Sequence, residues 1–332
     1  MSGVQHLQVQ PDQAGMRLDR WFRSLFPHIS HIQLVKLLRK GQIRVDGGRA
    51  KSSLRLEAWQ MIRVPPLATP DQSKHRVKQE KRAVPPHLQD MMLKSVIYED
   101  ADVIALNKPS GLAVQGGSKT DWHVDALLDV LSDKGERPRL VHRLDRDTSG
   151  VMLLAKHRKA ASSLTKAFAE RETRKTYWAL VHGVPRPEQG DIKLKLVKRA
   201  AGDGNERVRP AEDTDKEAMK AITRFNVVAR AGQIFSWVAF MPITGRTHQI
   251  RAHALAIGHP LVGDNKYSLP EIEAGGELPN KLHLHARMID MPHPSGGRLT
   301  VAADLQAHMA ESWNLLGFEP DDYEDAFPGE ES

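Results

Sequence analysis

The stretch His142-Arg-Leu-Asp-Arg-Asp-Thr-Ser-Gly150 leads directly into the apolar run Val151-Met-Leu-Leu-Ala155. A short, unbroken apolar run of this kind predicts a buried strand. Two arginines, two aspartates and a histidine lie in the segment before it, and Gly150 permits a close backbone approach. A polar loop attached to a rigid strand is typical of a functional site. A charged surface turn with local ion pairs is the alternative that this composition leaves open.

A second polar segment, Thr244-Gly-Arg-Thr-His-Gln-Ile-Arg251, follows a predicted strand over 235–240. Thr244-Gly245 predicts a turn, and the apolar residues after it predict a helix over 247–257. Arginines beside the backbone N–H groups of a helix start suit an anion or a carboxylate. The segment therefore predicts an anion-binding helix start, or alternatively an amphipathic helix whose basic side is solvated.

The elements expected around these segments do not alternate regularly between strand and helix. Strands are predicted over 103–106, 151–155, 177–182, 192–197, 221–227 and 235–240, and helices over 124–131 and around Ala161, Leu164 and Phe168. Because several strands follow one another without a helix between them, an α+β fold with a mixed sheet is favoured over a doubly wound parallel sheet.

Residues 15–65 predict a separate small unit. Apolar residues at helical spacing predict its first helix: Leu18, Trp21, Phe22 and Leu25. Ser30 and Gln33 form a capping box that opens a second helix, and Gly41 is placed to end it. A short strand over 43–45 and the hairpin-type turn Asp46-Gly47 follow. Two short helices and a strand, edged with cations, therefore make a compact module.

Charge is distributed unevenly along the 332 residues, whose net charge is +7. The first 90 residues hold 16 Lys and Arg against 7 Asp and Glu, which is typical of a polyanion binder, although a solvated charged surface is the alternative. A basic stretch rich in Pro and Gln predicts a linker. The expected division is a small domain over 15–65, this basic linker over 66–90, a larger domain over 91–318 and a disordered acidic tail over 319–332.

Several classes of protein are excluded by what the sequence lacks. The absence of cysteine excludes disulfides, cysteine-ligated zinc, iron–sulfur clusters and thiol catalysis. Walker, protein-kinase, HExxH and GxSxG patterns are missing as well, so neither a metal nor a cofactor is expected. Neither a signal-like segment nor an apolar stretch of membrane-spanning length occurs, so we expect a cytoplasmic protein and no membrane partner.

Four segments together resemble the motifs of the RluA family of RNA pseudouridine synthases. His142–Gly150 matches the HRLDxxTSG signature without a mismatch, and Lys108-Pro-Ser-Gly111 matches KPxG. Lys175–Gly183 matches K-x-Y-x-A-x-V-x-G, and Thr244–Arg251 matches the third motif of the family. The N-terminal unit resembles an S4 RNA-binding domain. An S4 domain before this catalytic domain resembles the RluC-type branch, which modifies large-subunit ribosomal RNA.

The resemblance implies an α+β fold, with an S4 domain before a catalytic domain whose mixed, largely antiparallel sheet is flanked by helices. It implies that the C1′–N1 bond of a uridine is broken and that C5 is joined to C1′, without a cofactor or metal. The implied partner is 23S ribosomal RNA or a large-subunit assembly intermediate, and a monomer is expected. A non-catalytic RNA-binding or ribosome-assembly factor is the alternative.

The resemblance also implies roles for individual residues. Asp145 is the catalytic aspartate, and Arg251 is the partner that keeps it ionised. Tyr177 stacks on the uracil and assists proton movement at C5, while Arg143 fills the space that a flipped base leaves. The remaining RNA-binding candidates are cationic: Lys108 and Arg246, which contact phosphate or support loops, and Arg17, Arg20, Lys36, Arg39 and Lys40 of the N-terminal unit.

Overall fold

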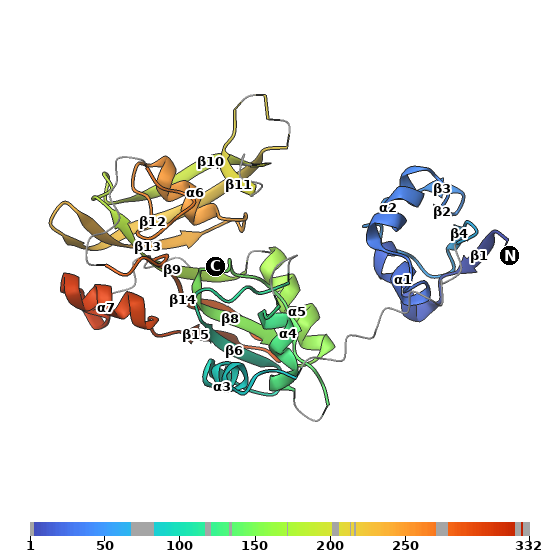
Figure 1. Ribbon diagram of the computed structural model, residues 1–332, viewed down its shortest axis with the longest axis horizontal. Helices are drawn as coiled ribbons and strands as arrows, with labels where there is room; N and C mark the ends of the chain where they lie inside the picture. The colour runs from blue at the N-terminus through green and yellow to red at the C-terminus, as the bar shows by residue number, and fades with distance from the viewer. Residues whose placement is uncertain are drawn as a thin grey trace. The chain divides into compact units, whose positions relative to one another are not determined.

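The computed structural model describes residues 3–67, 83–116, 121–132, 135–170, 172–200, 206–212, 214–215, 217–269, 278–322 and 327. The chain divides into two compact units, Met1–Ala83 and Val84–Ser332 (Figure 1). The division falls inside the predicted linker, most of which lies outside the described residues. Each unit has its own core and is described by itself.

The N-terminal unit packs two helices on a small sheet. Its helices are α1 (Leu18–Leu25) and α2 (His31–Arg39), and its strands are β1 (Gln5–Gln8), β2 (Arg44–Val45), β3 (Gly48–Arg49) and β4 (Met61–Val64). The antiparallel sheet has the order β1-β4-β2-β3. The Ser30 hydroxyl accepts a bond from the Gln33 N–H, and the Gln33 carboxamide oxygen accepts one from the Ser30 N–H, which confirms the predicted capping box.

Two predicted boundaries of this region are wrong. The N-terminal unit begins before residue 15, because β1 pairs with β4 and Val9 is fully buried in the core. At the other end, residues 86–90 are not linker but belong to α3 (Pro86–Lys94) of the second unit, where Met92 is buried. β1 is too short to give a periodic signal, whereas Leu88, Met91 and Met92 of α3 do lie at helical spacing next to the basic stretch.

The second unit is built on a large mixed sheet. Its strands are β5 (Val96–Glu99), β6 (Val103–Lys108), β7 (Arg139–Leu140), β8 (Ser149–Ala155), β9 (Arg174–His182), β10 (Gln189–Ala200), β11 (Glu206–Pro210), β12 (Met219–Ala231), β13 (Phe235–Pro242), β14 (Leu284–Pro292) and β15 (Arg298–Ala302). The main order is β11-β10-β12-β13-β9-β14-β8-β6-β5, with β15 beside β14 and β7 beside β8. Among the described strand pairs only β14 and β8 run parallel, so the predicted mixed, largely antiparallel sheet is confirmed.

Helices cover both faces of the sheet of the second unit. They are α4 (Val124–Leu127), which continues as a 3₁₀ turn over Leu128–Leu131, α5 (Arg158–Glu170), α6 (Gln249–Ala256) and α7 (Ala307–Leu316). Val151 and Leu153 pack in the same cluster as Leu164 of α5, whereas Met152 and Leu154 pack with α3 and α4. Because both faces of β8 are buried, its sequence is a continuous apolar run rather than an alternating one.

The acidic C-terminal segment is not wholly disordered, contrary to the prediction. Pro320–Asp322 forms a 3₁₀ turn, and Phe327 is buried in the same cluster as Trp237 and Trp313. Its carbonyl oxygen also accepts a hydrogen bond from Arg174 Nη2. The rest of this segment lies outside the described residues. No helix in the described part of the chain has the length and apolar character needed to cross a membrane.

Candidate active site

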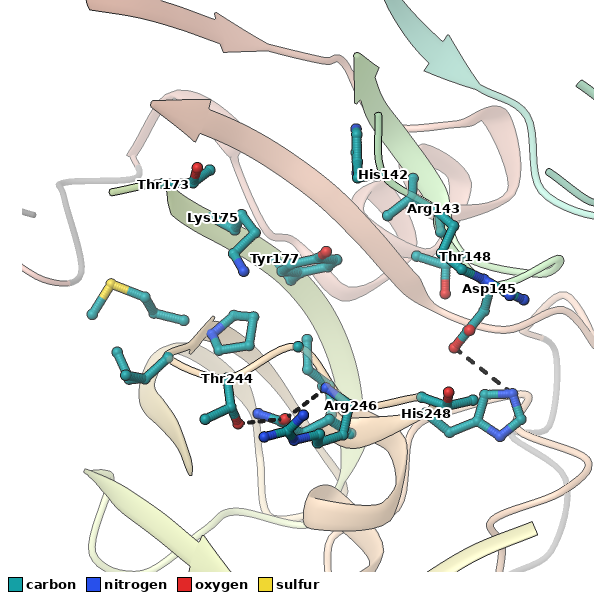
Figure 2. Close-up of a pocket in the computed structure, with 18 of the residues that line it drawn as sticks. His142, Arg143, Asp145, Thr148, Thr173, Lys175, Tyr177, Thr244, Arg246 and His248 are labelled. Carbon is teal, nitrogen blue, oxygen red and sulfur yellow. Dashed lines mark hydrogen bonds and ion pairs between the residues drawn. The ribbon is translucent and has the colours of Figure 1, made fainter. Parts of the chain in front are cut away.

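A pocket of about 730 Å³ opens where the loop 142–148 meets two other segments (Figure 2). These are the start of β9 and the connection over 241–251 between β13 and α6. The volume lies within the range of about 300–1,000 Å³ that is typical of small-molecule sites. The pocket brings together five of the predicted site residues: Arg143, Asp145, Tyr177, Arg246 and Arg251.

The loop 142–148 is held from both ends. At its start, His142 Nε2 accepts a hydrogen bond from the Leu153 N–H at 2.8 Å, and its ring stacks on Phe168 at 4.5 Å. Burial lowers the pKa of His142 to about 3, so the ring is neutral and acts as a fixed acceptor. At the other end of the loop, Gly150 lies against Ala286, where β8 and β14 run parallel. The loop is therefore rigid where it carries Asp145.

Lys108 supports this loop, which is one of the two roles expected of it. The side chain is fully buried, and Nζ donates to the carbonyl oxygens of Pro109, Leu112 and Arg146 at 2.8, 2.9 and 3.0 Å. Burial lowers the pKa of Lys108 to about 7, although the charges of Asp147 and Asp145 oppose that shift. The KPxG turn is therefore bonded to the loop that carries Asp145 and holds it in place.

Asp145 lies at the pocket wall with 22% of its side chain exposed. Its Oδ2 atom is 3.9 Å from Nε2 of His248, the interaction drawn as a dashed line in Figure 2. Burial lowers the pKa of His248, while the charge of Asp145 opposes the shift. An accessible carboxylate beside a histidine and near an arginine is thus available for attack or for proton transfer.

Arg251 does not bond directly to Asp145, contrary to the expected pairing. Its Nε and Nη2 atoms donate to Asp264 Oδ2 and Oδ1 at 2.7 and 2.6 Å, and both side chains are buried. Burial by itself would lower the pKa of Arg251, but the hydrogen bonds and charge of Asp264, together with the charge of Asp145, raise it. Asp264, rather than Asp145, therefore holds the guanidinium of Arg251 in place.

Tyr177 is on β9, opposite Phe240 of β13 and Ala286 of β14, and its side chain lines the pocket. Burial, and then the negative charge of Asp145, raise the pKa of Tyr177 above its usual value. The hydroxyl therefore stays protonated at neutral pH. An aromatic face with a protonated hydroxyl suits both stacking on a base and donation of a hydrogen bond.

Two arginines lie at the pocket in different settings. Arg143 is exposed, and within the described residues its guanidinium has no hydrogen bond or ion pair. Arg246 is half-buried, and its Nε donates to the Lys220 carbonyl oxygen at 3.3 Å. Arg143 is therefore the freer of the two, as expected for a side chain that enters a nucleic acid.

The turn into α6 is fixed by a polar pair. Thr244 Oγ1 donates to Gln249 Oε1 at 2.6 Å, and Gln249 Nε2 donates to the Ile222 carbonyl oxygen at 2.9 Å. The helix is shorter than predicted, and residues 249–254 are all buried, which contradicts the alternative of an amphipathic helix whose basic side is solvated. Arg251 bonds Asp264 and His253 is fully buried, because strands and the segment after the helix cover this helix.

Three residues of the site were not predicted as such: His248, Asp264 and Tyr267. His248 was placed on the basic helix without a role, whereas Asp264 and Tyr267 belong to the turn Gly263-Asp-Asn-Lys-Tyr267, which gave no helix or strand pattern. Their contacts with Arg251 and with one another come from the tertiary structure. The feature of the sequence that could have indicated these residues is the polar Gly263-Asp264 turn after the basic helix.

The predicted RNA-binding cations of the N-terminal unit fall into two groups. Arg20, Lys36, Arg39 and Lys40 are exposed. Arg17 is also exposed, but it donates to Asp19 from Nε and Nη2 at 3.2 and 2.6 Å, and this bond raises its pKa. Arg17 is therefore engaged within the protein, while the cations of α2 point to solvent.

Comparisons with known proteins identify relatives of this chain. A family model described as RNA pseudouridylate synthase matches residues 102–256. The chain is 37% identical over 303 residues to the ribosomal large subunit pseudouridine synthase C of Escherichia coli (strain K12), covering 89% of this chain and 91% of that protein. A protein of the same name from Vibrio cholerae is 34% identical over 318 residues, covering 93% and 96%. The solved structure of human RNA pseudouridylate synthase domain containing 4 has a TM-score of 0.60 at 28% identity, covering 70% of this chain and 97% of that one.

The chain therefore belongs to the RNA pseudouridylate synthase family. The relatives named above cover both units, whereas the solved structure covers about the length of the second unit. The predicted family, fold class and type of reaction are confirmed.

Proposed function

We propose that the protein converts specific uridines of large-subunit (23S) ribosomal RNA, free or in an assembly intermediate, into pseudouridine. Asp145 in the 730 Å³ pocket, between Tyr177, Arg143 and the Arg251–Asp264 pair, carries the proposal. The relatives named for large-subunit modification support the choice of RNA. Since this RNA is cytoplasmic, the protein works in the cytoplasm, and it acts as a monomer.

The reaction begins with extrusion of the target base from the folded RNA. Removing a base from its stack costs a few kcal/mol, part of which is offset when a side chain fills the space left behind. Arg143 is exposed at the pocket and free of partners among the described residues, so its planar guanidinium is suited to that space. The base then enters the pocket, where the ring of Tyr177 offers a stacking surface.

Asp145 then acts on the ribose. Either it attacks C1′ and the C1′–N1 bond breaks, or it removes the C2′ proton so that the C1′–N1 bond breaks and a glycal forms. In both routes the freed uracil rotates and C5 bonds to C1′, which displaces the Asp145 carboxylate in the first route and is accompanied by return of the proton to C2′ in the second. The C5 proton is then lost while N1 gains one. Both routes need an ionised carboxylate, and the guanidinium of Arg251 lines the same pocket. Tyr177 is protonated and lies in the same pocket, so it assists proton movement at the base.

The N-terminal unit supplies RNA affinity in this proposal. Its arrangement of two helices on a small sheet, with Lys36, Arg39 and Lys40 exposed on and just after α2, fits an S4-like RNA-binding domain. Cations that neutralise phosphates release counterions, so binding weakens as salt rises. Lys108 takes no part in that contact and Arg17 is paired with Asp19, so both are assigned structural roles here.

Tritium release from 5-[³H]uridine in unmodified large-subunit ribosomal RNA tests the function. Wild-type protein is expected to release tritium, and Asp145→Asn is expected to lose at least about a thousandfold in rate while it binds the RNA equally well. Asp147→Asn is the matched control, because Asp147 is a neighbouring carboxylate outside the pocket lining. Salt-sensitive binding by wild type without any release would favour the alternative, a non-catalytic RNA-binding or ribosome-assembly factor.

A further inference from the structure

His248 occupies an unusual backbone position at the pocket. It precedes α6 with φ of 52° and ψ of 22°, in the left-handed region that a bulky residue rarely adopts. This conformation belongs to the connection that also places Thr244 and Arg246 at the pocket (Figure 2). Conformations of this kind persist where surrounding contacts fix them, and they occur frequently at functional sites.

Tyr267 fixes the orientation of the His248 ring. Its hydroxyl oxygen is 2.9 Å from His248 Nδ1 and accepts a hydrogen bond from the Val208 N–H at 2.8 Å. Because the hydroxyl oxygen already accepts from Val208, its single proton is available for Nδ1. A neutral His248 then carries its own proton on Nε2. Nε2 is the atom that faces Asp145 Oδ2 at 3.9 Å.

The arginine expected to bind Asp145 is occupied elsewhere. Arg251 gives two hydrogen bonds to Asp264, and its guanidinium lies over the Tyr267 ring at 5.0 Å. Asp264 in turn accepts from the Tyr267 N–H at 3.0 Å. Tyr267 is therefore held by its backbone, its ring and its hydroxyl. Among the ion pairs of the described residues, the partner of the Asp145 carboxylate within 4 Å is the Nε2 atom of His248.

We propose that His248, with its tautomer set by Tyr267, is a positioning residue that holds one oxygen of the Asp145 carboxylate by an Nε2–H bond when uridine is bound. The inference rests on the proposed function. Hydrogen bonds of catalytic groups are often long in the free enzyme and shorten in the substrate complex. With Oδ2 held, Oδ1 is directed at the ribose, and the carboxylate cannot rotate away from C1′ or C2′.

A double-mutant cycle between residues 248 and 267 tests the proposal. Tyr267→Phe removes only the hydroxyl, and His248→Gln keeps an amide N–H near the place of Nε2 without a tautomer to set. We expect Tyr267→Phe to lower kcat for tritium release by about 10- to 100-fold in the wild-type background, the range found for groups that orient a catalytic ligand. In the His248→Gln background the same change is expected to alter kcat by less than about threefold.

Two further readouts separate positioning from a merely structural effect. RNA affinity from filter binding is expected to stay within about twofold in all variants, and His248→Gln is expected to retain more kcat than His248→Ala. Tyr267→Phe leaves the Val208 N–H unpaired in both backgrounds, so its loss of Tm is expected to be equal in the two. Ser312→Ala is the matched control, because it removes a buried hydroxyl–histidine bond to His283, 2.7 Å long and outside the pocket lining. It is expected to lower Tm and leave kcat unchanged.

The outcomes distinguish failure of the proposal from failure of the function. Equal losses of kcat from Tyr267→Phe in both backgrounds, or equal activity of His248→Gln and His248→Ala, would overturn the positioning role while wild-type release upholds the synthase. If wild-type protein releases no tritium from the ribosomal RNA, the proposed function fails and the positioning role fails with it.

Discussion

Gly150 lies so close to the backbone of Ala286 that a Cβ atom on it would come within 2.3 Å of the Ala286 carbonyl oxygen. The two residues are opposite each other where β8 and β14 run parallel, and Gly150 has φ of +103°. Both the space and the backbone conformation therefore require glycine. This contact fixes the end of the loop that carries Asp145.

Gly150→Ala is expected to lower the free energy of unfolding by at least about 2 kcal/mol, because it adds both a clash and backbone strain. Urea unfolding measures the loss. Gly317→Ala is the control, since Gly317 also has a positive φ, of +70°, but nothing lies within 4 Å of its Cβ position. That variant is expected to lose about 1 kcal/mol. Equal losses in the two variants would argue against crowding at Ala286.

Arg143→Ala is expected to reduce kcat/KM on folded ribosomal RNA by about 10- to 100-fold, because the space left by the extruded base is no longer filled. On a short RNA whose target uridine is already unpaired, the loss is expected to be smaller, since less unstacking energy is needed. Tritium release from both substrates gives the comparison. The same loss on both would show that Arg143 acts on the base in the pocket rather than on extrusion.

Tyr177→Phe keeps the aromatic ring and removes a hydroxyl whose raised pKa keeps it protonated. RNA affinity is expected to be unchanged, while kcat falls by about a hundredfold if the hydroxyl moves a proton at the base. Tyr177→Leu is expected to lose kcat and also to bind more weakly, because stacking is lost. Single-turnover release and filter binding report the two effects. A Tyr177→Phe variant with wild-type kcat would limit Tyr177 to stacking.

Changing Lys36, Arg39 and Lys40 together to Gln is expected to reduce the slope of log Kd against log salt by about two, because up to three phosphate contacts are lost. KM for ribosomal RNA should rise far more than kcat falls. Arg17→Gln is the comparison, since Arg17 is already bonded to Asp19. The change in the salt slope per charge removed should be smaller for Arg17→Gln than for the triple variant. A triple variant with an unchanged salt slope would place RNA binding outside α2.

Acid is expected to destabilise the fold through its buried histidines. Burial lowers the pKa of His253, His283 and His285 to about 4 from an ordinary value of 6.5. Between pH 6.5 and 4 the unfolded chain therefore binds more protons at these residues, so stability is full above pH 6.5 and falls as pH decreases through that window. Each group adds up to about 1.4 kcal/mol per pH unit to the slope.

Urea midpoints from pH 7.5 to pH 4.5 check this slope. His285→Gln removes one of the three histidines. The share of the pH slope of the free energy of unfolding that comes from these histidines is therefore expected to fall by about a third. A slope that is unchanged by this substitution would show that His285 is already protonated in the folded protein.

Much of the local structure was predictable, because neighbouring residues determine it. The apolar run 151–155, the capping box of Ser30 and Gln33, and the pattern of strands over 177–240 all appear in the structure with modest shifts of their ends. In contrast, β14 was not among the predicted strands. It contains His285 and Arg287, and these polar residues interrupt the apolar pattern by which a strand is predicted. Both have tertiary partners in the structure, because His285 bonds Ser149 and Arg287 lies over the Trp178 ring.

The sequence by itself determined the family, the type of reaction and the motif residues that line the pocket, because the motif residues are contiguous and keep their spacing in any fold. Only the tertiary structure decided their partners. It joined Arg251 to Asp264 and not to Asp145, and it buried Lys108 against three carbonyl oxygens. It also brought His248 to Asp145 and Tyr267 to His248. Those pairings depend on packing between segments distant in sequence, where burial and geometry, rather than residue type, select which groups meet.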